Sequence, residues 1–394
     1  MKQVFDLKYL SLCVLLVLTA LSYHPRYSSF VTDSDAVNPL NRYIYLMTVI
    51  TLIIYLFKLR WRNNVFVVTF FKCLIVITAV GSLLMLSGLT SDYFTEARNI
   101  LMAFVFLLLG YNSNLSRNQY VALIIIYAIT VSYCVFNQII SNFGGFVIAE
   151  VYLQYGKNTL GVITASSCVS LLIVALHSDR SFVKFVGWGL FLVLLFFTVT
   201  IRARAAFLTV FLLSAYIIYR KLKDNNVNIS RILGLLLLAL LLLLLASIFT
   251  NRVSNVWDYI YNSFTLNQGE DLTSGRMYRN IFALHLIGEA PLFGNLTLGY
   301  QYEWIHNYVL RQTSSFGLLG SLPLNILYFY IFVFMIKRVR NCKLCIDNIG
   351  FIVFFIPLII SLEEPTFPFA PGTGVILPFV LLGISLACQN DLTV

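Results

Sequence analysis

The sequence predicts an all-α integral membrane protein: a polytopic bundle of about 12 transmembrane helices with one large extracytoplasmic loop. Of its 394 residues, 59% are hydrophobic and only 11% are charged, whereas a soluble domain carries roughly 25% charged residues. The hydrophobic residues also occur in long blocks, and residues 232–250 are mostly leucine. Because these blocks are apolar on every side and do not alternate with period two, they predict helices and not barrel strands.

The predicted spans divide the chain into three parts. Residues 1–250 contain nine spans, residues 251–316 form the large loop, and residues 317–394 contain three more spans. We place them at 7–23, 42–57, 65–88, 99–112, 119–140, 158–176, 185–201, 205–219, 232–250, 317–336, 349–362 and 373–389.

The loops on one side of this predicted bundle carry nearly all of the lysines, together with about half of the arginines. Short cytoplasmic loops are enriched in Lys and Arg. We therefore expect this side, which includes both termini, to be cytoplasmic.

The cations of the opposite side are nearly all arginine, with Lys157 as the one lysine. Guanidinium grips phosphate or carboxylate through two parallel hydrogen bonds, which ammonium cannot do. The bias therefore predicts an anionic ligand that is reached from outside. The arginines are Arg26, Arg42, Arg98, Arg202, Arg204, Arg252, Arg276, Arg279 and Arg311.

The large loop is rich in aromatic residues and includes one amphipathic segment, residues 276–287 (RMYRNIFALHLI). Its hydrophobic side chains recur at helical spacing, which predicts a helix against the bundle or the bilayer. Glu289-Ala290-Pro291 then ends the helix.

Two pairs of arginines lie on the predicted outer side, one in the turn before residue 205 and one in the large loop. Arg202 and Arg204 lie between two apolar spans, where charge is costly unless it is paired. They either meet an anionic partner or anchor the turn at the membrane interface. Arg276 and Arg279 are one turn apart on the predicted helix, and they either bind a ligand or form a solvated face.

Two further clusters could supply a proton acceptor. His306-Asn307 precedes the next span, and histidine titrates near neutrality, although a lone histidine is also a common structural hydrogen-bonding residue. Glu363 and Glu364 end a span on the same side, and they either balance the arginines or act as a base. No phosphate-binding glycine loop and no complete set of metal ligands occurs in the sequence, so we expect neither a metal nor another cofactor.

Taken in order, these elements resemble the O-antigen polymerase and O-antigen ligase superfamily. The resemblance covers the chain from about residue 157 onward. Its motifs are residues 157–161 (KNTLG), residues 200–206 (TIRARAA), residues 274–276 (SGR) with 288–294 (GEAPLFG), and His306-Asn307 with residues 317–320 (GLLG). Ala203 and Ala205 stand where the family has Ser and Gly, which leaves the geometry around Arg204 open.

The resemblance implies a metal-independent glycosyltransferase of the bacterial inner membrane. Its donor would be an oligosaccharide linked to undecaprenyl diphosphate. A polymerase adds this glycan to another lipid-linked repeat unit, and a ligase adds it to lipid A-core. The 157–161 element favours the polymerase. No nucleic-acid partner is expected, membrane lipid is, and the participation of a chain-length regulator stays open.

On this hypothesis Arg204 and Arg276 bind the diphosphate and His306 is the base or orients the acceptor. Preorganised arginines would stabilise the charge that develops on the leaving group. We expect further substrate contacts from Arg202, Arg279, Asn307, Lys157, Asn158, Arg311, Glu363 and Glu364.

Two other function classes stay open. A flippase or other transporter would place ionisable groups near the middle of the membrane, where Lys72 is the one clear charge in the predicted spans. A purely structural membrane scaffold would not explain the arginine bias.

Overall fold

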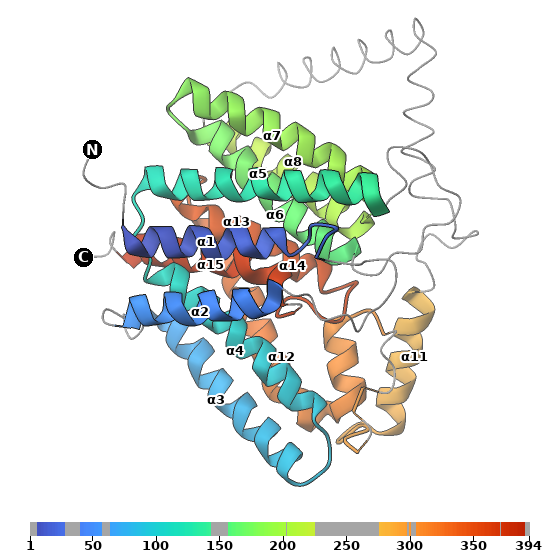
Figure 1. The fold of residues 1–394 in the computed structure, drawn as a ribbon. Coiled ribbons are helices and arrows are strands. Elements are labelled where there is room, and N and C mark those ends of the chain that lie inside the picture. The colour runs from blue at the N-terminus through green and yellow to red at the C-terminus, as the bar shows by residue number, and fades with distance from the viewer. Residues whose placement is uncertain are drawn as a thin grey trace, which may run out of the picture.

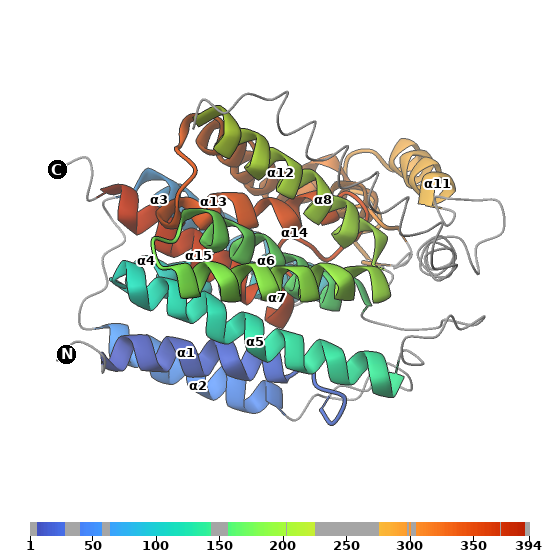
Figure 2. The same ribbon diagram turned by 90° about the horizontal axis from the view of Figure 1, so that it is seen from above.

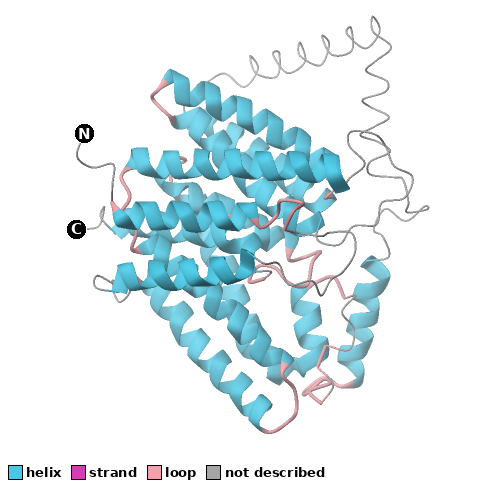
Figure 3. Ribbon diagram, in the orientation of Figure 1, coloured by secondary structure: helices cyan, strands magenta, loops and turns pink. Residues whose placement is uncertain are grey.

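The computed structural model describes residues 6–27, 40–56, 64–142, 157–201, 203–224, 276–297, 299–300, 305–370 and 372–390. Within these ranges the regular structure is entirely helical (Figures 1 and 3). The prediction of an all-α chain is thus confirmed for the described residues. The helices are α1 (Leu7–Leu21), α2 (Leu40–Leu56), α3 (Val65–Leu86), α4 (Asp92–Tyr111), α5 (Arg117–Asn142), α6 (Lys157–His177), α7 (Ser181–Thr200), α8 (Arg204–Asp224), α11 (Arg276–Glu289), α12 (Tyr308–Asn341), the short 3₁₀ helix η1 (Ile346–Asn348), α13 (Ile349–Val353), α14 (Phe355–Ile360) and α15 (Gly372–Asn390).

Seven of these helices are long and apolar enough to cross a membrane: α3, α4, α5, α6, α7, α8 and α12. Four shorter apolar segments accompany them, formed by α1, α2, residues 346–360 and α15. Together they cover every predicted span except 232–250, which lies outside the described residues. Large apolar side chains such as Phe211 and Leu192 are more than half exposed on the bundle surface. A soluble protein rarely leaves such surface bare, so the helices indicate a membrane protein.

Helix α6 is the centre of the bundle. Its span is 89% buried, compared with 28% for α3, α7 and α8, and it packs against α5, α7, α8 and α15 (Figure 2). Next to it, α4 and α15 approach backbone to backbone. A Cβ atom added to Gly110 would collide with the Val380 carbonyl, and one added to Gly383 would collide with the Leu107 carbonyl. Small residues at such contacts allow close helix packing in lipid.

Helix α12 is broken at Gly317, which has φ 68° and ψ 178°. L-residues avoid this conformation, whereas glycine adopts it freely. The sequence predicted that a span begins at residue 317. In the structure a buried helical segment, residues 308–316, precedes the break, so α12 begins nine residues earlier at Tyr308.

The chain that follows α11 satisfies the backbone groups freed by this break. The N–H groups of Leu318 and Leu319 donate to the carbonyls of Pro291 and Leu292. In return, the N–H of Asn295 donates to the Ser315 carbonyl at 2.9 Å. The residues after α11 therefore clamp the two halves of α12 in place, as buried irregular backbone in a membrane requires.

Candidate active site

The first residues of α6, α8 and α11 lie at one end of the bundle, next to the segment that precedes α12 and the segment that follows α14 (Figure 1). Between them is a cavity of about 660 Å³. Polar and apolar side chains line it: Arg204, Arg276, Asn280, His306 and Glu363, with Ala205, Phe207, Leu208, Met277 and Leu362.

Arg276 is held by two adjacent carboxylates. Its Nη1 lies 2.6 Å from Oε2 of Glu363, and its Nη2 lies 2.9 Å from Oε1 of Glu364. The Arg276 side chain is only 24% exposed, and the side chains of Glu363 and Glu364 are 42% and 12% exposed. Both ends of the guanidinium fork are therefore engaged on a partly desolvated surface, where such bonds are stronger than in water.

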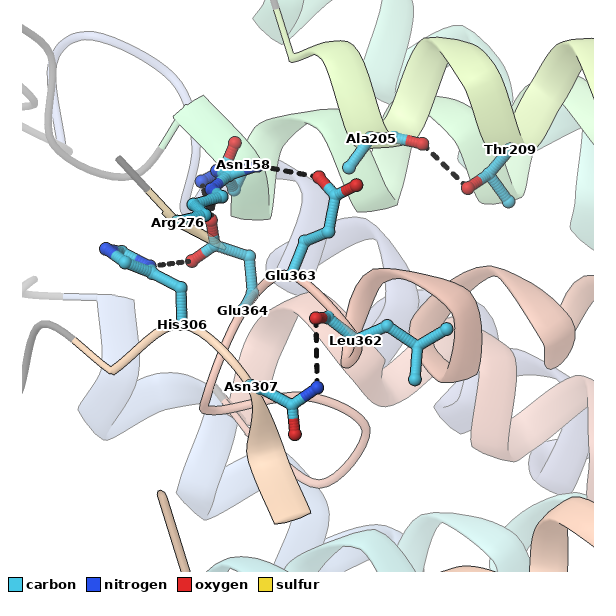
Figure 4. Close-up of polar contacts among 9 residues, drawn as sticks. All are labelled: Asn158, Ala205, Thr209, Arg276, His306, Asn307, Leu362, Glu363 and Glu364. Atoms are coloured by element: carbon cyan, nitrogen blue, oxygen red, sulfur yellow. Dashed lines mark hydrogen bonds and ion pairs between the residues drawn. The ribbon is translucent and has the colours of Figure 1, made fainter. Parts of the chain in front are cut away.

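Glu364 connects the arginine to two further residues (Figure 4). Its Oε1 accepts a hydrogen bond from Nδ2 of Asn158 at 2.5 Å. Its Oε2 lies 3.7 Å from Nδ1 of His306, which is beyond hydrogen-bonding distance. The other ring nitrogen of His306 points away from the carboxylates (Figure 4). The imidazole thus presents one nitrogen to Glu364 and the other away from it.

The segment after His306 is fixed to the chain before Glu363. The Asn307 side chain caps α12 by accepting from the N–H of Leu310 at 3.0 Å, and its amide donates to the Leu362 carbonyl at 3.1 Å. The N–H of Tyr308 donates to the Ser361 carbonyl at 3.0 Å. These bonds set the distance between His306 and the two glutamates. Asn307 therefore positions the segment through a side chain whose donor and acceptor are both used.

The start of α6 packs closely on the start of α8. A Cβ atom added to Gly161 would lie 2.6 Å from the Cβ of Ala203 and 2.9 Å from that of Ala206. Only a glycine allows this approach, which brings Asn158 and Arg204 to the same end of the bundle. Ala203 is buried in this contact.

The structure does not place the other predicted arginines or Lys157 in the cavity wall. Arg202 and the side chain of Lys157 are outside the described part of the chain. Arg279 is half-buried on α11 but does not line the cavity. Arg311 is likewise absent from the cavity wall, because it lies in the buried first segment of α12.

Arg311 belongs to a second, buried cluster with Tyr300 and Glu96. Its guanidinium lies 3.8 Å from the centre of the Tyr300 ring. The Tyr300 hydroxyl lies 2.9 Å from Oε1 of Glu96 and 2.7 Å from Oε1 of Gln312, and the Tyr300 N–H donates to Asp92. Burial, together with the nearby Glu96 carboxylate, raises the pKa of Tyr300 well above its ordinary value, so the phenol stays protonated. The cluster ties the chain just before His306 to α4.

Sequence reasoning missed Glu96 and Asn280. The predicted fourth span begins at residue 99, but α4 begins at Asp92, which puts Glu96 inside the helix and 4% exposed. The available signal was a carboxylate five residues after Ser91, which is the residue that precedes the helix. Asn280 follows Arg276 by one turn, and the periodicity of α11 already placed the two on one side.

In the described part of the chain, no group of three or more His, Cys, Asp or Glu residues is arranged to hold a metal ion. Comparison with known proteins adds no relative, because no protein-family model and no curated protein matches this sequence.

Proposed function

We propose that this protein is a membrane glycosyltransferase that polymerises oligosaccharide repeat units carried on undecaprenyl diphosphate. The observation that carries the proposal is the cavity that joins Arg204, Arg276 and His306 at one end of an apolar helix bundle. Two guanidinium groups beside a histidine suit a reaction in which a diphosphate leaves and an acceptor hydroxyl loses its proton.

The arginines would hold the diphosphate. Arg276 is engaged by Glu363 and Glu364, so a diphosphate would take the place of at least one carboxylate. Glu363 is the more exposed of the two, so its displacement should cost less than that of Glu364. Glu364 would stay with Asn158. Such an exchange keeps Arg276 oriented before the donor arrives.

His306 would accept the proton. The acceptor oxygen attacks the anomeric carbon of the donor while its proton passes to the imidazole. The bond from the anomeric carbon to the diphosphate oxygen breaks, and the diphosphate leaves with the electron pair. Glu364, 3.7 Å from Nδ1, would stabilise the imidazolium that forms. Direct displacement of this kind inverts the configuration at the anomeric carbon.

The apolar wall of the cavity suits a lipid-linked donor. Leu208, Met277 and Leu362 line the cavity, and each is at least half exposed. They continue onto the lipid-facing surface of α8. An isoprenoid chain could lie on this surface while its diphosphate reaches the arginines. With about twelve spans and both termini in the cytoplasm, the cavity would open on the extracytoplasmic face of the bacterial inner membrane.

A gel of the surface polysaccharide from cells that lack this protein tests the proposal. Polymerase function predicts that the long ladder disappears and that a single repeat unit remains on lipid A-core. Loss of all polysaccharide from lipid A, with long chains retained on undecaprenyl diphosphate, would instead identify an O-antigen ligase. An unchanged surface ladder would refute both assignments.

One observation favours a second function, transport of the lipid-linked oligosaccharide. Transporters often use discontinuous helices with buried ionisable groups beside the break. Helix α12 is broken at Gly317, and the buried residue Arg311 belongs to the segment before the break. The buried Glu96 is linked to the same segment through Tyr300, whose hydroxyl contacts both Glu96 and Gln312. If the protein is a transporter, cells that lack it should accumulate repeat units on the cytoplasmic side. We favour the glycosyltransferase because these two charges lie outside the cavity.

A further inference from the structure

A second polar cavity of about 440 Å³ lies at the opposite end of the bundle from the candidate active site, between the starts of α5 and α7. These two helices run side by side (Figures 1 and 2). The cavity is lined by Arg117, Asn118, Val121, Ala122, Ile125, Ser178, Asp179, Arg180, Val183 and Ile346.

The mouth of this cavity is basic. Arg117 and Arg180 line it, and α5 and α7 both begin there, at Arg117 and Ser181. Helix N-termini carry partial positive charge from the aligned peptide dipoles, and they favour anions. Two guanidinium groups and two helix starts thus converge on one cavity.

The guanidinium groups of Arg117 and Arg180 make few contacts with the rest of the protein. Arg117 donates to the His177 carbonyl at 3.0 Å and pairs with Asp179 at 3.5 Å. That pair is weak, because the side chains are 51% and 87% exposed. Within the described residues, the Arg180 guanidinium has no hydrogen bond or ion pair. An incoming phosphate can therefore displace Asp179 and engage both arginines.

The wall of the cavity is apolar. Val121 and Ile125 follow Arg117 on α5, and Val183 follows Arg180 on α7. Arg117 to Ile125 spans about 12 Å along the helix axis, a distance suited to the upper part of an acyl chain. A free phosphate would gain nothing from this wall, whereas the acyl chain of a phospholipid would cover it.

We propose that this cavity binds an anionic phospholipid of the surrounding leaflet. Its phosphodiester sits between Arg117 and Arg180, and one acyl chain lies along Val121, Ile125 and Val183. Basic pockets between transmembrane helices recognise lipid head groups in this way. The site is separate from the proposed glycosyltransferase cavity and does not depend on that proposal.

Binding to the full-length protein, measured by native mass spectrometry in mild detergent, tests the inference. The probes are phosphatidylglycerol and phosphatidylcholine with identical acyl chains. The wild-type protein should retain phosphatidylglycerol preferentially. The R117A/R180A variant should bind it at least roughly tenfold more weakly. The matched control R338A/R340A removes two exposed arginines from the last turn of α12, at the same end of the bundle as the cavity. This variant should bind phosphatidylglycerol as the wild type does.

Three outcomes would overturn the inference. The first is a wild-type protein with no preference between the two lipids, a result that requires no variant to fold. The second is equal weakening in R117A/R180A and the control, which would indicate a diffuse charge effect. The third is displacement of phosphatidylglycerol by millimolar glycerol phosphate, which would show that the phosphate is recognised without the acyl chain.

Discussion

The guanidinium of Arg276 lies 2.9 Å from the carboxylate of Glu364, although 88 positions separate the two residues in the sequence. The contact joins the first residue of α11 to the turn after α14. Through Glu364 the same contact reaches Asn158 and His306. Residues from three distant parts of the chain therefore meet at one carboxylate, and most of the predictions below concern this group.

Replacing Arg276 by lysine should remove most of the activity. Lysine keeps the positive charge but loses the fork that contacts Glu363 and Glu364 and that would grip a diphosphate. We expect a loss of at least roughly 100-fold in polymer formation, since each tenfold corresponds to about 1.4 kcal/mol of transition-state stabilisation. The matched control is Arg279→Lys, one turn further on the same helix and outside the cavity. Equal losses in both variants would show that Arg276 has no special role.

The two glutamates should differ in their effect on stability. Glu364→Gln weakens contacts with Arg276 and His306 at a site that is 12% exposed, so we expect a loss of about 1–3 kcal/mol. Glu363→Gln affects a side chain that is 42% exposed and should cost at most about 1 kcal/mol. Thermal unfolding of the purified variants in one detergent measures the difference. A greater cost for Glu363→Gln would contradict the arrangement described.

Gly317→Ala should destabilise the protein strongly. The residue has φ 68° and ψ 178°, and an added Cβ would collide with the backbone of Leu292. The conformation alone costs roughly 1–3 kcal/mol for an L-residue, and the clash would also open the clamp between residues 291–295 and α12. Gly288→Ala is the control, because Gly288 is helical and an added Cβ there would meet nothing within 4 Å besides its own helix. Equal unfolding temperatures for the two variants would show that the contact between residues 291–295 and α12 does not stabilise the protein.

Arg311 should act on stability and not on substrate binding. Arg311 lies over the Tyr300 ring and interacts electrostatically with the buried Glu96 carboxyl. Loss of these two interactions should cost about 1–3 kcal/mol. We therefore expect Arg311→Met to lower the unfolding temperature sharply. The double variant E96Q/R311M should lose less stability than the two single variants added together. Purely additive losses would show that Glu96 and Arg311 do not interact.

Hydropathy predicted the helices well because a span needs only length and apolar composition. The amphipathic pattern also placed α11 correctly, with Glu289 as its last residue. The end of a span is harder to predict where polar residues enter the buried part. Tyr308 to Phe316 contains Arg311, Gln312 and several hydroxyl side chains, so it was assigned to the loop, yet it is buried helix.

The members of the candidate site could be proposed from the sequence, but their partners could not. Residue type suggested that Arg276, His306 and Glu364 take part in anion binding or proton transfer. Whether they meet depends on how α6, α11 and α14 pack, which no local pattern encodes. Arg311 was grouped with them for its charge alone, and the structure places it against Tyr300 instead.

The most direct test of the central claim uses the purified full-length protein in vesicles supplied with an undecaprenyl-diphosphate-linked repeat unit. We expect a ladder of lipid-linked polymer from the wild-type protein and none from His306→Ala, whereas Arg279→Lys should still form the ladder. Passage of intact repeat units across the vesicle membrane, without any joining, would contradict the claim and identify a transporter.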